Sequence, residues 1–239
     1  MSDQASVTEM FDGIAESYDR LNHLLSFGID RLWRRKTSKL ISRQHPSSIL
    51  DVATGTADLA IQLAHDNVDA IVSGVDLSEK MLSIGKQKVN GKKLSDRIHL
   101  EVADAIALPF SDNSFDAVTV AFGVRNFSDR EAGLSEMVRV CRNGGRVAVL
   151  EFSHPTKALV KTAYGWYSRR WIPRVGKSVS KHPSAYSYLP SSVEAFPSTE
   201  AFVTMLAKAG LSDIHTKTLS RGIATLYYGC AAKNDGPSQ

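Results

Sequence analysis

The sequence contains only two cysteines and no long apolar run. Cys141 and Cys230 are too far apart to form a CxxC pair, so we expect neither a disulfide framework nor a cysteine-based zinc site, and a reducing compartment is the default. No apolar run approaches the roughly 20 residues that a transmembrane helix needs. The first nine residues are polar and lack the apolar core of a secretory signal. We therefore expect a cytoplasmic protein.

Acidic residues are absent from one long segment. No Asp or Glu occurs between Phe152 and Val193, where seven Lys and Arg residues are interleaved with tyrosine and tryptophan. The whole-chain net charge of 29 − 25 = +4 therefore divides into +7 in this segment and 22 − 25 = −3 elsewhere. Basic residues among aromatics are typical of a membrane surface, a cover over a substrate, or a nucleic-acid site. The small net charge alone gives no reason to prefer nucleic acid.

Short apolar runs alternate with helical patterns from residue 48 onward, which is typical of a parallel sheet covered by helices. The expected strands are 48–53, 70–75, 97–103, 115–122, 146–152, 211–219 and 223–231. The expected helices are 10–25, 30–42, 57–65, 78–89, 129–140 and 198–209. Asp30, Ser78 and Ser198 are candidate N-caps, and Gly144-Gly145 suggests a tight turn before a strand.

These patterns predict an α/β protein with a Rossmann-like, seven-stranded, mostly parallel sheet. We expect helices on both faces of the sheet, an antiparallel C-terminal strand and a helical N-terminal cover. The expected domains are an N-terminal helical lid over residues 1–46 and a sheet domain over residues 47–239, in which residues 153–197 form a basic, aromatic insertion.

Acidic residues and small residues stand at the ends of the first three strands. Asp51-Val52-Ala53-Thr54-Gly55-Thr56-Ala57-Asp58 runs from a strand through a loop into a helix, the usual ligand site of open α/β sheets. It lacks both GxGxxG and Gly-Lys-Ser/Thr, which argues against a phosphate ligand. Asp76 ends the next strand, where a carboxylate accepts from ribose hydroxyls. Asp104 and the Ala105 amide end the third strand and suit an adenine edge, so the pattern favours an adenosine without phosphates.

The order Asp51-x-x-x-Gly55-x-x-Asp58, then Asp76, then Asp104 resembles class I S-adenosylmethionine-dependent methyltransferases. More narrowly, the chain resembles the ubiquinone/menaquinone biosynthesis C-methyltransferase family over roughly residues 10–232. The segments that carry this resemblance are 11–19 (FDGIAESYD), 21–23 (LNH), 30–34 (DRLWR), 107–110 (ALPF), 122–126 (FGVRN), 150–153 (LEFS), 188–193 (YLPSSV) and 196–197 (FP). The N-terminal block and Phe-Gly-x-Arg-Asn are far more specific than the strand-end pattern, which a very large superfamily shares.

The resemblance implies ring C-methylation of a prenylated quinol, with S-adenosylmethionine as donor and no metal. We favour demethylmenaquinol as the acceptor, and a benzoquinol precursor of ubiquinone stays open. The donor site is assigned to Asp51, Gly55, Thr56, Asp76, Asp104 and Ala105. Three positions depart from the family pattern: Ala57 replaces a common glycine, Ala121 a serine of some members, and Asn143 a proline.

Arg125, Asn126 and Tyr18 are the candidate catalytic residues. Arg125 and Asn126 follow the fourth strand, where a guanidinium would stabilise a phenolate-like oxygen and the amide would orient a hydroxyl or a water. Arg125 could instead pair with Asp129 or Glu131 on the next helix. Tyr18 would stand over the cavity if its helix acts as a lid, or it could simply continue that helix's apolar face.

Several alternatives stay open at this stage. The same donor site could serve a different small acceptor, and a non-catalytic donor-binding module is a second alternative. A dinucleotide-dependent oxidoreductase would need the glycine and the pyrophosphate-binding helix start that are missing here. Because a prenylated quinol resides in the bilayer, we favour membrane-surface or lipid contact for residues 153–197 over a plain substrate cover, and expect no nucleic-acid partner. A homodimer is left open.

Overall fold

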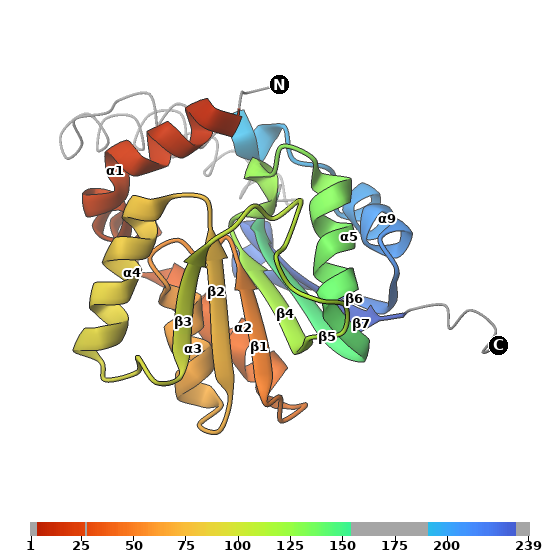
Figure 1. The fold of residues 1–239 in the computed structure, drawn as a ribbon. Helices are drawn as coiled ribbons and strands as arrows, with labels where there is room; N and C mark the ends of the chain where they lie inside the picture. Colours follow the sequence, from red (N-terminus) through yellow and green to blue (C-terminus); the bar gives the residue numbers. More distant parts are fainter. Residues whose placement is uncertain (1–3, 27, 154–190, 233–239) are drawn as a thin grey trace.

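The computed structural model describes residues 4–26, 28–153 and 191–232 (Figure 1). Its strands are β1 (Ser48–Val52), β2 (Ile71–Asp76), β3 (Ile98–Val102), β4 (Phe115–Ala121), β5 (Cys141–Phe152), β6 (Leu211–Leu219) and β7 (Ala224–Ala231). Its helices are α1 (Gln4–Leu25), α2 (Ile29–Ser42), α3 (Asp58–Asp66), α4 (Glu79–Gly91), α5 (Arg130–Val140) and α9 (Thr199–Lys208), with the short 3-10 turns η1 (Val124–Asn126) and η3 (Ser220–Gly222). Most of the predicted insertion 153–197 lies outside the described residues.

The strands form one seven-stranded sheet in the order β3-β2-β1-β4-β5-β7-β6. β1 to β5 pair in parallel, and β7 is antiparallel to both β5 and β6. The predicted fold class is therefore confirmed, including the antiparallel C-terminal pair. The order runs outward from β1 in both directions, so β1 and β4 form the switch point at which such sheets bind ligands.

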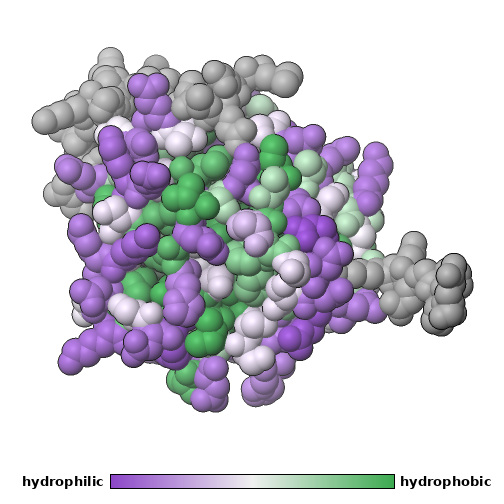
Figure 2. Space-filling model, in the orientation of Figure 1, coloured by the Kyte–Doolittle hydropathy of each residue, from purple (hydrophilic) through white to green (hydrophobic). Residues whose placement is uncertain are grey.

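Two apolar cores lie on the two faces of the sheet. α5 and α9 cover one face through residues such as Leu134 and Phe202, and α2, α3 and α4 cover the other through Trp33, Leu63 and Val89. The β3–β4 connection contains no helix in residues 103–114. Figure 2 shows the result, since apolar surface is visible in the middle of the face between α4 and α5, surrounded by hydrophilic residues.

Two of the three predicted helix N-caps are confirmed. Ser78 and Ser198 are N-caps, because their hydroxyl groups accept from the backbone N–H groups of Met81 and Ala201. The prediction for Asp30 was wrong. The N-cap of α2 is Gly28, whose φ of 73° favours glycine, while Asp30 lies inside the first turn and is buried.

The predicted turn at Gly144-Gly145, before the fifth strand, is not formed, although both positions do need glycine. β5 begins at Cys141, so Gly144 and Gly145 lie within the strand, where the pairing with β4 is irregular. Gly144 has a φ of 73°, and a Cβ on Gly145 would lie 2.7 Å from the carbonyl oxygen of Asp116. Both positions therefore require glycine, although they form no separate turn between α5 and β5.

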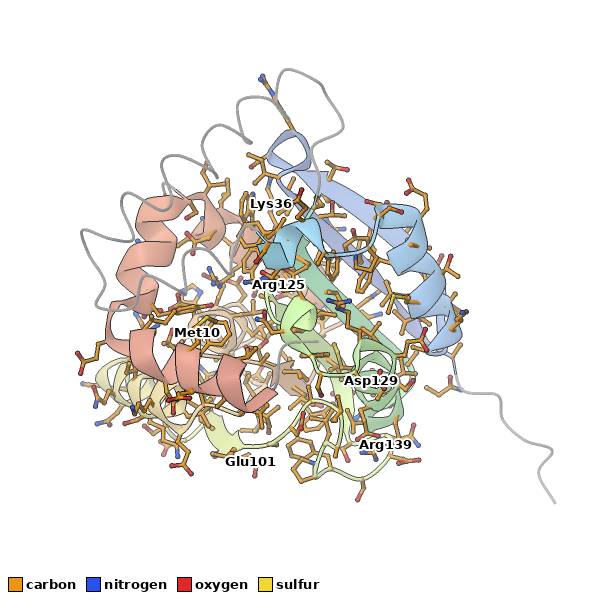
Figure 3. The ribbon with its side chains drawn as sticks, turned by 90° about the horizontal axis from the view of Figure 1, so that it is seen from above. Met10, Lys36, Glu101, Arg125, Asp129 and Arg139 are labelled. Atoms are coloured by element: carbon orange, nitrogen blue, oxygen red, sulfur yellow. The ribbon has the colours of Figure 1, made fainter. Side chains whose placement is uncertain are left out.

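α1 lies across the edge of the sheet at which β1, β2 and β4 end. Figure 3, which looks down on this edge, shows the helix crossing it, with Met10 on the helix. Val7, Ile14 and Ala15 are buried apolar residues among those of α1 whose side chains the structure describes. A helix that covers the ligand edge of an open sheet limits access to whatever binds there.

Candidate functional site

A cavity opens at the carboxyl ends of the strands, directly beneath α1. It is lined by residues of α1 (Val7, Thr8, Phe11, Tyr18), of the loop after β1 (Ala53, Gly55), of the end of β2 and the start of α4 (Asp76, Leu77, Ser78, Met81), of the loop after β3 (Ala103, Asp104, Ala105) and of the end of β4 with the segment that follows it (Ala121, Phe122, Gly123, Asn126, Phe127). Six of the nine predicted site residues are among them: Tyr18, Gly55, Asp76, Asp104, Ala105 and Asn126.

Asp76 stands at the end of β2 with its carboxylate fixed by backbone amides. Its Oδ2 accepts from the Gly55 N–H at 2.8 Å, and its Oδ1 accepts from the Ser78 N–H at 2.9 Å. Burial raises the pKa of Asp76 above its ordinary value, although these backbone hydrogen bonds oppose the shift. Each carboxylate oxygen has a second acceptor position, so the two oxygens can still accept from a pair of neighbouring hydroxyl groups.

Asp104 and Ala105 form the wall on the other side of the cavity. A single β-bridge links Asp104 to Ala107, and the Ile106 N–H donates to Asp104 Oδ1 at 3.1 Å. This tight turn holds a carboxylate and the backbone of Ala105 at the cavity surface. An acceptor beside a backbone donor matches the amino group and ring nitrogen of an adenine edge.

Asp51 is buried behind the loop rather than in the main cavity. Its carboxylate accepts from the hydroxyl groups of Thr54 at 2.7 Å and Thr119 at 2.9 Å. Burial raises the pKa of Asp51 from 3.8 to about 6. Asp51 thus holds the loop after β1 in place, and it lines a second, smaller cavity next to the first.

The loop after β1 has three residues with a positive φ. The φ is 51° for Ala53, 57° for Gly55 and 65° for Ala57, and the left-handed conformation costs a residue with a Cβ roughly 1–2 kcal/mol. The glycine that many family members carry at the position of Ala57 therefore has a conformational reason. The alanine keeps the same backbone path, and α3 begins immediately after it.

Thr56 contacts α1 instead of the main cavity. Its hydroxyl group donates to Asp19 Oδ1 at 2.5 Å, and Lys88 Nζ lies 2.8 Å from Asp19 Oδ2. Lys88 also pairs with Asp58. Near the other end of the same helix, the Ser78 hydroxyl donates to Asp12. Together, the Asp12 and Asp19 contacts fasten α1 over the site.

The three predicted catalytic residues occupy different environments. Tyr18 and Asn126 line the cavity, and the ring of Tyr18 lies edge-on to Phe11 at 5.9 Å between centroids. Arg125, labelled in Figure 3, does not line it. Its guanidinium is buried, where Nη1 donates to Glu151 Oε1 at 2.8 Å and also to the carbonyl oxygen of Phe122. The ion-pair partner of Arg125 is therefore Glu151, and not Asp129 or Glu131 as the sequence had suggested.

Sequence reasoning missed Glu151, the partner of Arg125. Glu151 is fully buried at the end of β5, and its Oε2 accepts from the backbone N–H of Arg125 at 3.3 Å. A carboxylate directly after the apolar run Val147–Leu150 was the signal that could have identified it, because an ionised group is buried only with a partner. The pair ties the end of β5 to the segment from Phe122 to Asn126.

The family model that matches this chain is the ubiE/COQ5 methyltransferase family, over residues 1–231. A demethylmenaquinone methyltransferase of Bacteroides fragilis is 46% identical over 221 residues, which cover 92% of this chain and 90% of that one. A ubiquinone/menaquinone biosynthesis C-methyltransferase of Geobacter sulfurreducens is 46% identical over 224 residues, covering 93% and 87% of the two chains.

Solved structures with the same fold are more distant in sequence. An S-adenosylmethionine-dependent methyltransferase of Thermotoga maritima superposes with a TM-score of 0.63 at 18% identity, over 93% of this chain and 98% of that one. At this identity the likeness shows the fold alone. The family model and the relatives together confirm the resemblance predicted from the sequence: the chain belongs to the ubiE/COQ5 methyltransferase family.

Proposed function

We propose that this protein transfers a methyl group from S-adenosylmethionine to a ring carbon of a prenylated quinol. The favoured acceptor is demethylmenaquinol, in menaquinone biosynthesis. The observation that carries the proposal is that Gly55, Asp76, Asp104 and Ala105 line one cavity at the carboxyl ends of β1, β2 and β3. Relatives with 46% identity are named for this reaction.

The donor's adenosine fits the polar end of the cavity. Asp76 has acceptor positions for both ribose hydroxyls, while Asp104 and Ala105 offer an acceptor and a backbone donor for the adenine edge. Leu77 and Met81 supply apolar surface beside Asp76 for the flat ring. These contacts orient the donor, and correct orientation alone supplies roughly 7–11 kcal/mol toward a bimolecular reaction.

The acceptor's ring fits the apolar end of the cavity, between α1 and the segment after β4. Phe11, Phe122 and Phe127 line this end, and Asn126 and Tyr18 are its hydrogen-bonding side chains. S-adenosylmethionine supplies a methyl group that its sulfonium charge already activates. The protein then has to place a ring carbon in line with that methyl, so that the new C–C bond forms as the C–S bond of the donor breaks and S-adenosylhomocysteine leaves. It also has to hold the quinol oxygen that donates electron density to the ring, and α1 has to limit the access of water.

Arg125 acts in this proposal as a positioning residue. Its charge is neutralised by Glu151, and its contact with the Phe122 carbonyl fixes the segment that presents Asn126. The direct stabilisation of a phenolate oxygen that the sequence suggested for Arg125 therefore passes to Asn126 and Tyr18. Removing one such donor in other enzymes lowers kcat by about 10²–10³.

Donor binding is tested by calorimetry with S-adenosylhomocysteine. Asp76→Ala is expected to weaken binding at least tenfold, because each lost hydrogen bond to a charged group is worth about 1.5–3 kcal/mol. The matched control is Asp69→Ala, an exposed aspartate before the start of β2 and so at the opposite end of that strand, which should leave the affinity unchanged. Unchanged affinity in Asp76→Ala would contradict the ribose assignment.

Acceptor choice is tested with reduced, short-chain prenyl substrates. We expect faster methyl transfer to a demethylated naphthoquinol than to the matching benzoquinol. Asn126→Ala is expected to lower kcat by about 10²-fold while the dissociation constant of S-adenosylhomocysteine stays at the wild-type value. Faster transfer to the benzoquinol would assign the enzyme to the ubiquinone precursor, and transfer only to a soluble acceptor would contradict the quinol proposal.

We also propose peripheral contact with an anionic membrane, from which the quinol would reach the site. The residues that suggested this, 153–197, lie mostly outside the described part of the chain. α2 supports it independently, because Leu32 is 52% exposed and Ile29 38% exposed. They stand among the exposed cations of this helix: Arg31, Arg35, Lys36 (labelled in Figure 3) and Lys39. No helix in the described ranges is long and apolar enough to span a bilayer.

Flotation with anionic vesicles tests the membrane proposal. The double variant Arg35→Gln/Lys39→Gln should bind the vesicles less strongly at low salt, since each Lys or Arg near an anionic membrane surface contributes about 1 kcal/mol to the free energy of binding. The matched control removes the same charge from the exposed end of α4, as Lys92→Gln/Lys93→Gln. Equal binding by both double variants and the wild type, or no binding by any of them, would contradict contact through α2.

A further inference from the structure

Phe127 forms part of the wall of the main cavity, and its ring rests on α5. The residue follows η1 directly, and its backbone N–H donates to the carbonyl oxygen of Val124 at 3.2 Å. Two positions later, Asp129 caps α5 by accepting from the backbone N–H of Ala132. This short connection leaves the half-buried Phe127 side chain between α5 and the cavity that it lines.

Gly133 is the residue of α5 against which that ring packs. A Cβ on Gly133 would lie 2.5 Å from Cδ2 and 2.9 Å from Cε2 of Phe127. Carbon atoms in van der Waals contact are about 3.5–4.0 Å apart, so a side chain at this position would displace the ring by about 1 Å. Because α5 stands behind the ring, the displacement would be toward the cavity.

The backbone of α5 does not itself require a glycine at this position. Gly133 is buried within the helix, and its N–H donates to the carbonyl oxygen of Asp129 at 3.1 Å, as in any helical turn. A glycine in a helix interior is less favourable than an alanine. What Gly133 provides in return is the room in which the ring of Phe127 lies.

α1 forms another wall of the same cavity, through residues that include Phe11. Seen from above, Met10 of α1 and Asp129 at the start of α5 lie on different sides of Arg125 in η1 (Figure 3). The side-chain contacts of Asp12 and Asp19 fasten α1 over the site. The room for a flat ring between α1 and the segment after β4 therefore depends on how far the ring of the latter is set back toward α5.

We propose that Gly133 sets the acceptor specificity of the enzyme, because it lets the Phe127 ring lie back against α5 and so leaves room for a bicyclic quinol. The inference rests on the proposed function, since it requires the acceptor ring to lie at the apolar end of the cavity. It deepens that function by naming the pair of residues that distinguishes a naphthoquinol from a benzoquinol. Gly133 acts through Phe127 and is a positioning residue.

The test is equilibrium binding of two quinols to the enzyme loaded with S-adenosylhomocysteine. Both quinols carry the same short prenyl chain and have no free ring carbon to methylate, and one is a naphthoquinol and the other a benzoquinol. We expect Gly133→Ala to bind the naphthoquinol roughly tenfold more weakly and the benzoquinol less than about threefold more weakly. Its affinity for S-adenosylhomocysteine should stay at the wild-type value.

Two further variants connect the effect to the ring and to this position. Gly133→Ala/Phe127→Leu, in which a smaller side chain replaces the ring, should recover most of the affinity for the naphthoquinol. Gly91→Ala is the matched control, because Gly91 is an exposed glycine of α4 and a Cβ there would have nothing within 4 Å. This control should bind both quinols as the wild type does.

Phe127→Trp tests the same room without a change in α5. The larger ring on the same glycine should project into the cavity and weaken naphthoquinol binding more than benzoquinol binding. This variant takes the place of Gly133→Ala if the latter does not fold, which lost binding of S-adenosylhomocysteine would report.

The outcomes separate the inference from the proposed function. An equal loss for both quinols, or an unchanged ratio of the two affinities, in Gly133→Ala and in Phe127→Trp would overturn the inference while the quinol site stands. A double variant as weak as Gly133→Ala would show that the glycine does not act through the ring, and would also overturn it. A wild type that binds neither quinol would instead remove the proposed acceptor.

Discussion

The buried pair of Arg125 and Glu151 gives the sharpest prediction for a single substitution. Glu151→Gln keeps the shape of the side chain but removes its charge and one acceptor oxygen. In the wild type, Oε1 accepts from Arg125 Nη1 at 2.8 Å and from the Phe152 N–H at 2.9 Å, and Oε2 accepts from the Arg125 N–H at 3.3 Å. The side chains are 5% and 0% exposed, so water cannot replace the lost partner.

Breaking such a pair lowers the free energy of unfolding by about 3–5 kcal/mol. This is a large part of the roughly 5–15 kcal/mol by which a folded domain is stable. Urea unfolding followed by circular dichroism and tryptophan fluorescence measures this free energy. Trp33 is a suitable reporter because its ring lies 6.2 Å from that of Phe152. A loss below about 1 kcal/mol, the value of an exposed ion pair, would refute the reasoning.

A double-mutant cycle separates the pair from general damage to the core. Arg125→Met and Glu151→Leu each leave one buried charge without its partner, whereas the double variant leaves none. The double variant should therefore be less destabilised than the sum of the two single variants. Simple additivity would contradict the ion pair. In Glu151→Gln, kcat should fall while the affinity for S-adenosylhomocysteine is kept, since the pair positions Asn126 and not the donor site.

Three further predictions follow from individual contacts. Burial raises the pKa of Asp51 from 3.8 to about 6, so the folded protein holds a proton that the unfolded chain releases, and wild-type stability should fall as pH rises through this window by on the order of 3 kcal/mol. In urea titrations across this pH range, Asp51→Asn should lose that slope, and an unchanged slope would contradict the assignment. Gly123→Ala would place a Cβ 2.6 Å from that of Ala53, so overpacking of about 1–3 kcal/mol should lower the melting temperature and reduce methyl transfer; wild-type values for both would count against the contact. Lys88→Gln should speed hydrogen exchange in α1 with little change in melting temperature, because a partly exposed pair is worth about 0–1 kcal/mol, and unaltered exchange would show that Lys88 does not fasten the helix.

The sheet and the adenosine end of the site could be predicted because their signals are local. Apolar runs with regular spacing marked the strands, and Asp76 and Asp104 each directly followed such a run. Parallel strands bring their carboxyl ends to one edge, so the position of each acid in the chain was enough to place it in the cavity. The N-cap at Ser78 was predictable for the same reason, since a cap depends on the residues of its own turn.

The rest of the site depends on contacts between distant segments. Arg125 and Glu151 are separated by 26 positions, and no local pattern showed that the arginine would turn into the core rather than toward the ligand. The hydroxyl group of Thr56 and the amino group of Lys88 meet Asp19 only because α1 folds back across the sheet. Asp30 was mistaken for an N-cap because α2 begins earlier than the sequence suggested: its N-cap is Gly28, in the left-handed conformation, two positions before Asp30.

The most direct test of the account is methyl transfer by the purified protein, measured by mass spectrometry of the quinol product with isotope-labelled S-adenosylmethionine. The account predicts one labelled methyl group on a ring carbon of a demethylated prenyl naphthoquinol with the wild type. It predicts little product with Asp76→Ala and the wild-type amount with Asp69→Ala. No ring methylation by the wild type, or equal product from Asp76→Ala, would contradict it.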